Sequence, residues 1–217
     1  MNWVILAAAV SAASPAPAPK ADAKADAKVA AAAPDAHAPA AAEPAADVDP
    51  DLPKAGDAVL GFRLRALNPD MNGQFVGIDT LVGSDRDDDK SKLLVLSFMA
   101  SYCKPCKKEM PYLQKLYAKY KDKGLRVLMV AVDTDEAGQN AVSELVKTNG
   151  VTFPVLKDIG GLTSRRYLGS RTPLPSMFIV TADGNIQSVK RGYNEQASQA
   201  LLADVQKALG VPAEEIK

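Results

Sequence analysis

Residues 98–111 read FMASYCKPCKKEMP, and this stretch holds both cysteines of the 217-residue chain. The continuous apolar run just before it, at residues 93–98, predicts a strand buried on both faces. Residues 102–120 space their apolar side chains along one face of a helix. Cys103 and Cys106 therefore lie where a buried strand gives way to a helix, whose unpaired N–H groups favour a thiolate over a thiol.

The order of the two cysteines predicts different roles for them. Cys103 comes first, at the exposed start of the helix, and is the expected attacking thiolate. Cys106 lies one turn inside, so its sulfur can reach back and resolve a mixed disulfide. Lys104 adds positive potential, and Pro105 occupies a first-turn position where no amide donor is required.

Three other uses of a Cys-x-x-Cys pair fit this chain less well. A zinc site needs two further ligands, and residues 54–217 contain no other Cys and no His. Haem attachment needs a His directly after the second cysteine, where this chain has Lys107. A purely structural disulfide would close too short a loop to stabilise much. Dithiol–disulfide exchange, with no metal and no cofactor, is therefore the favoured chemistry.

The composition excludes several other classes of protein. The chain has 26 basic and 26 acidic side chains, which argues against nucleic-acid binding by bulk electrostatics. Its single histidine, His37, lies in a stretch rich in Ala and Pro, so Ser-His-Asp and Cys-His catalysis are excluded for the rest of the chain.

Composition also divides the chain into three parts. Residues 1–13 carry an apolar run followed by small residues, which is typical of a secretory signal although it is short and lacks a basic start. Residues 14–53 are mostly Ala and Pro and are expected to form a disordered spacer. Residues 54–217 have the size of one domain. We therefore expect an exported protein of the periplasm or cell envelope.

Within the expected domain, strand-like and helix-like segments alternate. The predicted strands are residues 62–67, 93–98, 126–132, 176–180 and 186–191, and the predicted helices are residues 102–120, 134–149, a short stretch near 167, and 194–209. This order implies an α/β fold whose central mixed sheet is parallel at first, antiparallel at its last hairpin, and covered by helices on both faces. The acidic run at residues 85–90 lacks the ligand spacing of a calcium loop and predicts a solvated loop.

Residues 98–111 closely resemble the active-site segment of the TlpA-like thiol–disulfide oxidoreductases of the thioredoxin superfamily. Further matches, in the family's order, are Gly56-Asp57 with Phe62, Phe153-Pro154-Val155, Pro175-Ser176-Met177-Phe178 and Asp183-Gly184. The resemblance covers nearly all of residues 55–210 and is closest to the cytochrome c maturation branch. It implies a thioredoxin-like fold and a monomer that reduces disulfides in partner proteins. It also implies an upstream electron donor such as a membrane thiol transporter.

The resemblance also implies roles for four residues besides the cysteines. Pro175 matches the family's cis-proline, and Leu174 matches the position that pairs backbone to backbone with a bound peptide. Tyr102 completes the expected docking surface. Glu109 matches a carboxylate that raises the pKa of the thiols and handles protons. The alternative for Glu109 is a solvated helix residue paired with a lysine.

This chain departs from the family pattern at three positions. Met99 and Tyr102 stand where the family often has Trp, and Ser97 stands where many relatives place a buried acid or amide. Glu109 is therefore the expected proton-handling group.

Two other functions stay open at this point. The first is a copper(I) carrier that uses Cys103 and Cys106 with Met99 or Met177 as soft ligands. The second is a peroxiredoxin-like peroxidase, which the missing Thr-x-x-Cys arrangement argues against.

Overall fold

The computed structural model describes residues 51–68, 70, 74–83 and 91–216. The predicted signal at residues 1–13, most of the predicted spacer and the acidic run at residues 85–90 lie outside the described residues. The predicted boundaries of these segments therefore stay predictions.

In this part of the chain the strands form one seven-stranded sheet of order β2-β1-β5-β4-β3-β6-β7. The strands are β1 (Arg63–Ala66), β2 (Phe75–Gly77), β3 (Leu93–Met99), β4 (Leu125–Ala131), β5 (Val155–Lys157), β6 (Ser176–Thr181) and β7 (Ile186–Arg191). The central strands β3, β4 and β5 pair in parallel, and all other neighbours are antiparallel. The predicted mixed sheet, with its antiparallel hairpin at the end, is confirmed.

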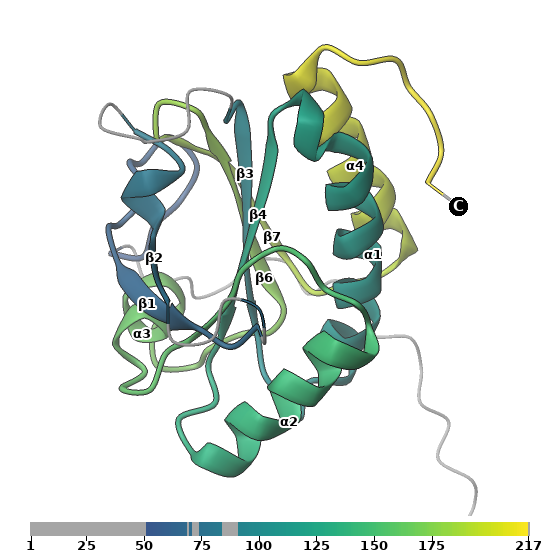
Figure 1. The fold of residues 1–217 in the computed structure, drawn as a ribbon. Coiled ribbons are helices and arrows are strands. Elements are labelled where there is room, and N and C mark those ends of the chain that lie inside the picture. Colours follow the sequence, from purple (N-terminus) through teal and green to yellow (C-terminus); the bar gives the residue numbers. More distant parts are fainter. Residues whose placement is uncertain (1–50, 69, 71–73, 84–90, 217) are drawn as a thin grey trace, which may run out of the picture. The chain divides into compact units, whose positions relative to one another are not determined.

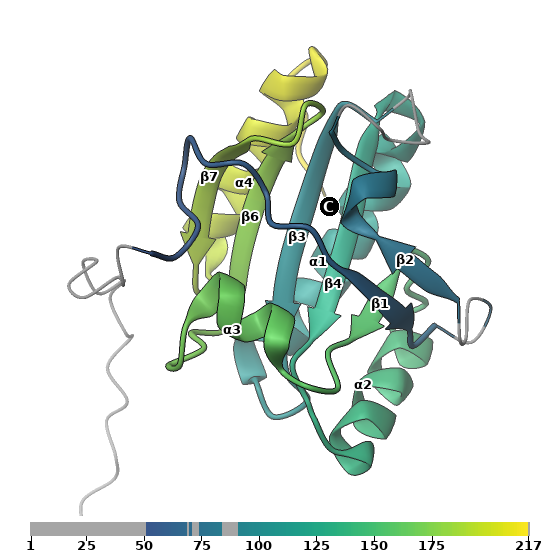
Figure 2. The same ribbon diagram turned by 90° about the vertical axis from the view of Figure 1, so that its left-hand side faces the viewer.

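Helices cover both faces of the sheet, as predicted. They are α1 (Lys104–Tyr120), α2 (Glu136–Thr148), α3 (Leu162–Leu168) and α4 (Glu195–Leu209). Buried side chains of α1, α2 and α4 form one apolar core with one face of the sheet, and α3 packs on the other face (Figures 1 and 2). In the described part of the chain, no helix has the length and apolarity needed to cross a membrane.

The buried strand β3 supplies both cores because successive side chains point to opposite faces. Val95 and Met99 join the core under α1, whereas Leu96 and Phe98 join the core under α3. Ser97 has the same parity as Val95 and Met99, so it faces α1.

The ends of several elements differ from the predictions for local reasons. The sequence does not predict β2 or β5, because three residues are too few to show an alternating pattern. Helix α1 begins at Lys104 and ends at Tyr120, and a 3₁₀ turn (Lys121–Lys123) separates it from Gly124. Gly124 has φ 107°, so it caps this added turn and not α1 itself. Asp135 caps α2 and Asn194 caps α4, because each side-chain oxygen accepts a hydrogen bond from a backbone N–H of the first turn.

The three parallel strands end at the same edge of the sheet. Met99 of β3 pairs with Ala131 of β4, and Ala131 pairs with Lys157 of β5, so the three strands finish at one level. The starts of α1 and α2 follow directly. Ligands bind most often at this carboxyl edge in open α/β sheets, and the Cys-x-x-Cys pair lies there.

Asn68 fixes the chain around β5 and leads to a stability prediction. Its fully buried amide donates to the carbonyl oxygens of Phe153 (2.9 Å) and Val151 (3.4 Å) and accepts from the N–H of Val155 (2.7 Å). Asn68→Ala leaves these buried groups unpaired, so we expect it to lower the free energy of unfolding by about 2–4 kcal/mol in urea titrations.

Gln114 provides a matched control, because it bonds to the neighbouring residue Thr152 of the same segment at an exposed position. Gln114→Ala should cost less than about 1 kcal/mol, because water replaces the lost bonds. Equal losses for the two variants would contradict the role assigned to Asn68.

Candidate active site

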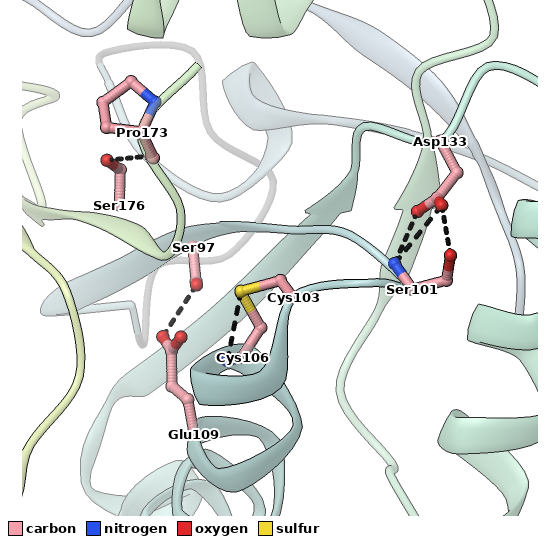
Figure 3. The surroundings of a disulfide bond; sticks show 8 residues. All are labelled: Ser97, Ser101, Cys103, Cys106, Glu109, Asp133, Pro173 and Ser176. Carbon is pink, nitrogen blue, oxygen red and sulfur yellow. Dashed lines mark hydrogen bonds between the residues drawn. A yellow bond between two sulfur atoms is a disulfide. The ribbon is translucent and has the colours of Figure 1, made fainter. Parts of the chain in front are cut away.

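Cys103 and Cys106 form a disulfide bond at the start of α1, with their Cα atoms 5.3 Å apart. Cys103 is the N-cap residue, and its Sγ accepts a hydrogen bond from the N–H of Cys106 at 3.2 Å (Figure 3). Cys103 keeps 7 % of its surface exposed, whereas Cys106 keeps none. Of the two cysteines, only Cys103 therefore has surface open to a reaction partner, and the attacking and resolving roles of the two sulfurs stay predictions.

The surroundings of Cys103 favour the thiolate once the disulfide is reduced. The first turn of α1 contains no acidic residue, and Lys104, Lys107 and Lys108 in its first two turns are exposed. The N–H of Cys106 already points at the sulfur of Cys103. Helix N-termini and nearby cations both lower the pKa of a cysteine, so the site can hold a nucleophilic sulfur at neutral pH.

Glu109 lies one turn beyond Cys106 and is completely buried. The Ser97 hydroxyl donates to its Oε1 at 2.8 Å, while Oε2 has no hydrogen-bond partner among the described residues (Figure 3). Burial raises the pKa of Glu109 from 4.5 to about 8, and the bond from Ser97 offsets part of that rise. Glu109 is therefore protonated over most of the neutral range, and the alternative of a solvated surface residue is wrong.

Tyr193, in the turn between β7 and α4, is electrostatically coupled to Glu109. Burial raises the pKa of the Tyr193 hydroxyl, and the charge of Glu109 raises it further. The buried carboxyl thus affects a second ionisable group near the same edge.

The loop before β6 brings Pro175 beside the end of β3. Ser176 pairs with Phe98 across the antiparallel strands, and the Leu174–Pro175 peptide bond is cis, as the resemblance implies. The carbonyl oxygen of Pro175 accepts from the N–H of Gly192 at 2.8 Å. Leu174 is half-buried against both cores. The docking roles of Leu174 and Pro175 stay predictions.

Three exposed apolar side chains lie at the carboxyl edge. Tyr102, which follows β3, is 73 % exposed, and it was expected at the docking surface. Ile159 and Leu162, which follow β5, are 56 % and 61 % exposed and were not singled out from the sequence. Ile159 and Leu162 follow the third parallel strand, so a prediction of β5 would have placed them at this edge. The three residues of β5 are too few to predict a strand.

A second pair of residues at this edge has no local signal in the sequence. The carboxylate of Asp133, just beyond β4, accepts hydrogen bonds from Ser101 in the turn between β3 and α1 (Figure 3). The two residues are 32 positions apart in the sequence, and only the parallel pairing of β3 with β4 brings them together.

The two methionines considered as copper(I) ligands lie in the protein core. Met99 and Met177 are fully buried in the same core as the two cysteines. Within the described ranges, no group of three or more His, Cys, Asp or Glu side chains could hold a metal ion.

Two curated proteins named thiol-disulfide oxidoreductase ResA are similar to this chain. One, from Oceanobacillus iheyensis, is 32 % identical over 140 residues, which cover 64 % of this chain and 66 % of that protein. The other, from Bacillus thuringiensis subsp. konkukian, is 42 % identical over 115 residues, which cover 52 % of this chain and 62 % of that protein. The chain thus spans slightly less than two thirds of either relative.

Among solved structures, a similar fold occurs in a protein from Chlorobium tepidum assigned as a thiol:disulfide interchange protein DsbE. The match has a TM-score of 0.60 at 26 % sequence identity and covers 73 % of this chain and 99 % of that one.

The sheet order, a Cys-x-x-Cys disulfide at the start of α1 and the cis-proline before β6 define a thioredoxin-like protein. A family model described as the AhpC/TSA family matches residues 68–189, more than half of the chain. The chain belongs to this family, and it is similar to proteins named thiol-disulfide oxidoreductase ResA.

Proposed function

We propose that this protein is an exported thiol–disulfide oxidoreductase that reduces disulfides in partner proteins through Cys103 and Cys106. The observation that carries the proposal is the asymmetry of the disulfide, in which only Cys103 has exposed surface. The names of its relatives, thiol-disulfide oxidoreductase, support the same chemistry.

The reaction begins from the reduced protein. The Cys103 thiolate attacks one sulfur of a substrate disulfide, and the other substrate sulfur leaves as a thiolate. Cys106, as a thiolate, then attacks the Cys103 sulfur of the mixed disulfide. This step forms the Cys103–Cys106 disulfide and releases the second substrate sulfur. Two electrons pass to the substrate, and an upstream dithiol donor restores the reduced pair.

Glu109 handles protons in this scheme. With its pKa raised to about 8, its buried carboxyl is a proton donor at neutral pH that needs no imidazole. When Glu109 ionises, its negative charge disfavours a nearby thiolate and raises the pKa of the thiols. Ser97, which replaces the buried acid or amide of many relatives, acts as the hydrogen-bond donor that orients this carboxyl.

The proposal includes two kinds of partner. The substrate is a protein with a surface disulfide that docks on Tyr102, Leu174 and Pro175. The electron donor is a dithiol protein such as a membrane thiol transporter. We place the protein, as a monomer, in the periplasm or cell envelope, on the basis of the signal-like residues 1–13.

The proposal is tested by mixing the reduced protein with a synthetic peptide that contains one intramolecular disulfide. One peptide disulfide should be reduced for each protein oxidised. A reduction potential near about −270 mV would support a reductant and one near about −120 mV an oxidant. Tight binding of one copper(I) ion without peptide reduction, or turnover of hydrogen peroxide in its place, would overturn the proposal.

The docking surface gives a further prediction. Tyr102→Ala removes an exposed ring next to Cys103 without touching the sulfurs, so we expect KM for the peptide disulfide to rise about three- to tenfold. The reaction with a small aromatic disulfide should change by less than about twofold, because that substrate does not need the ring. Tyr102→Phe, which keeps the ring, is the matched control, and an unchanged KM in Tyr102→Ala would show that the ring does not dock substrate.

A further inference from the structure

The carboxylate of Asp133 holds the turn that leads from β3 into the active site. The N–H of Ser101 donates to both carboxylate oxygens, at 3.0 Å to Oδ2 and 3.2 Å to Oδ1, and the Ser101 hydroxyl donates to Oδ1 at 2.6 Å. Asp133 itself is buried. A buried carboxylate that accepts from both a backbone and a side-chain donor of one residue restrains that residue strongly.

Asp133 is in turn fixed by its own surroundings. The N–H of Val132 donates to the carbonyl oxygen of Met99 at 2.9 Å, so β4 stays paired with β3 up to the residue before Asp133. Gln139 donates to the carbonyl oxygen of Asp133 at 3.3 Å. A Cβ atom at Gly138 would lie 2.5 Å from the Asp133 Oδ1, so α2 approaches this side chain as closely as a glycine allows.

The turn held by Asp133 leads to Tyr102 and Cys103, the two residues that the proposed function places against a substrate first. The N–H of Cys103 donates to the carbonyl oxygen of Ala100 at 3.1 Å, which closes a turn with Ser101 and Tyr102 at its centre. Fixing the N–H of Ser101 therefore fixes the direction of the turn. That direction sets where the exposed ring of Tyr102 points and where the Cys103 sulfur emerges from the start of α1.

We propose that Asp133, through its hydrogen bonds to Ser101, is a positioning residue that holds Tyr102 and Cys103 in the geometry needed to dock and attack a disulfide. The inference rests on the proposed function. It adds a residue from the segment that follows β4 to a site otherwise built from α1, the turn before it and the cis-proline loop. Asp133 contacts neither sulfur, so it acts on the reaction through the Ser101 turn.

The test compares Asp133→Asn and Ser101→Ala with the wild-type protein in turnover of the peptide disulfide. Excess dithiothreitol regenerates the reduced protein after each turnover. Asp133→Asn keeps one acceptor oxygen but places an amide donor against the Ser101 N–H, so we expect kcat/KM to fall about tenfold, mainly through a higher KM. Ser101→Ala loses only the hydroxyl bond, so its kcat/KM should lie between those of Asp133→Asn and the wild type. Ser101→Thr keeps the hydroxyl and should have the wild-type kcat/KM. Alkylation of reduced Cys103 by iodoacetamide at high pH should change by less than about twofold, because the sulfur itself stays intact.

Asp135→Ala is the matched control. Asp135 is the neighbouring carboxylate that caps α2 by accepting from the N–H of Gly138 at 2.8 Å, and it makes none of the Ser101 bonds. Losing a helix cap should lower stability by about 1 kcal/mol and leave KM unchanged.

The possible outcomes separate the inference from the proposed function. If the wild-type protein reduces no peptide disulfide, the proposed function fails. If the wild type is active and Asp133→Asn and Ser101→Ala keep its KM, the positioning role is overturned. A rise in KM for Asp135→Ala as large as for Ser101→Ala would also overturn it, because the effect would then follow stability and not the Ser101 bonds. If Asp133→Asn fails to fold, the KM values of Ser101→Ala and Ser101→Thr alone decide whether the Ser101–Asp133 bonds position the site.

Discussion

Replacing Cys106 with serine should trap a covalent complex between Cys103 and a substrate. Cys103 remains able to attack a disulfide, but the mixed disulfide can no longer be resolved from within the protein. We expect turnover of the peptide disulfide to fall by roughly 10³-fold or more. At the same time a one-to-one mixed disulfide should accumulate, visible by intact mass and on a non-reducing gel.

Cys103→Ser tests whether the two sulfurs have the assigned roles. Cys106 is fully buried, so in this variant no sulfur is open to the substrate. We expect the same loss of turnover but no trapped complex. Trapping by Cys103→Ser as efficient as that by Cys106→Ser would reverse the roles, and turnover that survives in both variants would remove the cysteine pair from the mechanism. The complexes trapped by Cys106→Ser from a cell-envelope extract would then name the natural substrates.

The cysteine pair could be placed from the sequence because its signal is local. A buried strand, two cysteines at helical spacing and a proline in the first turn all lie within 14 residues, and each part predicts the same junction. The cis form of the Leu174–Pro175 bond, in contrast, has no local signal. It was expected only because the order of motifs resembles a known family.

The parts that the sequence did not provide depend on contacts between distant segments. That Glu109 is buried depends on which face of α1 lies on the sheet, and helical spacing alone leaves Glu109 near the boundary of that face. Ser97 faces Glu109 only because side chains alternate along β3, which places Ser97 on the face of the sheet that α1 covers. The Ser101–Asp133 bonds require β3 and β4 to pair in parallel and end at one level. Short strands such as β5 carry too few residues for any pattern to be recognised.

Glu109→Gln should stabilise the oxidised protein increasingly as the pH rises from about 4.5 to about 8. Burial raises the pKa of Glu109 from its ordinary value of 4.5 to about 8, so between these pH values the folded state binds a proton that the unfolded state has lost. The wild-type protein therefore loses stability as pH rises through this window, by about 5 kcal/mol in total from a shift of this size. Gln does not titrate and keeps an acceptor for the Ser97 hydroxyl. Urea titrations at pH 4, 6 and 9 measure the difference in unfolding free energy between Glu109→Gln and the wild type. This difference should be near zero at pH 4, rise by pH 6 and reach several kcal/mol at pH 9.

The oxidised and reduced proteins answer two separate questions about Glu109. In the oxidised protein the sulfurs do not titrate, so the stability difference reports the burial of the carboxyl alone. Glu144→Gln is the control there: Glu144 is exposed and pairs with Lys147, and its effect should stay within about 1 kcal/mol at every pH. In the reduced protein, proton handling predicts that Glu109→Gln removes the part of the Cys103 thiolate titration that is delayed near and above pH 8, because only there does an ionised Glu109 oppose the thiolate. If the stability difference appears but the thiolate curve does not move, Glu109 is a buried acid that takes no part in the exchange, and the proton must reach the sulfurs from solvent.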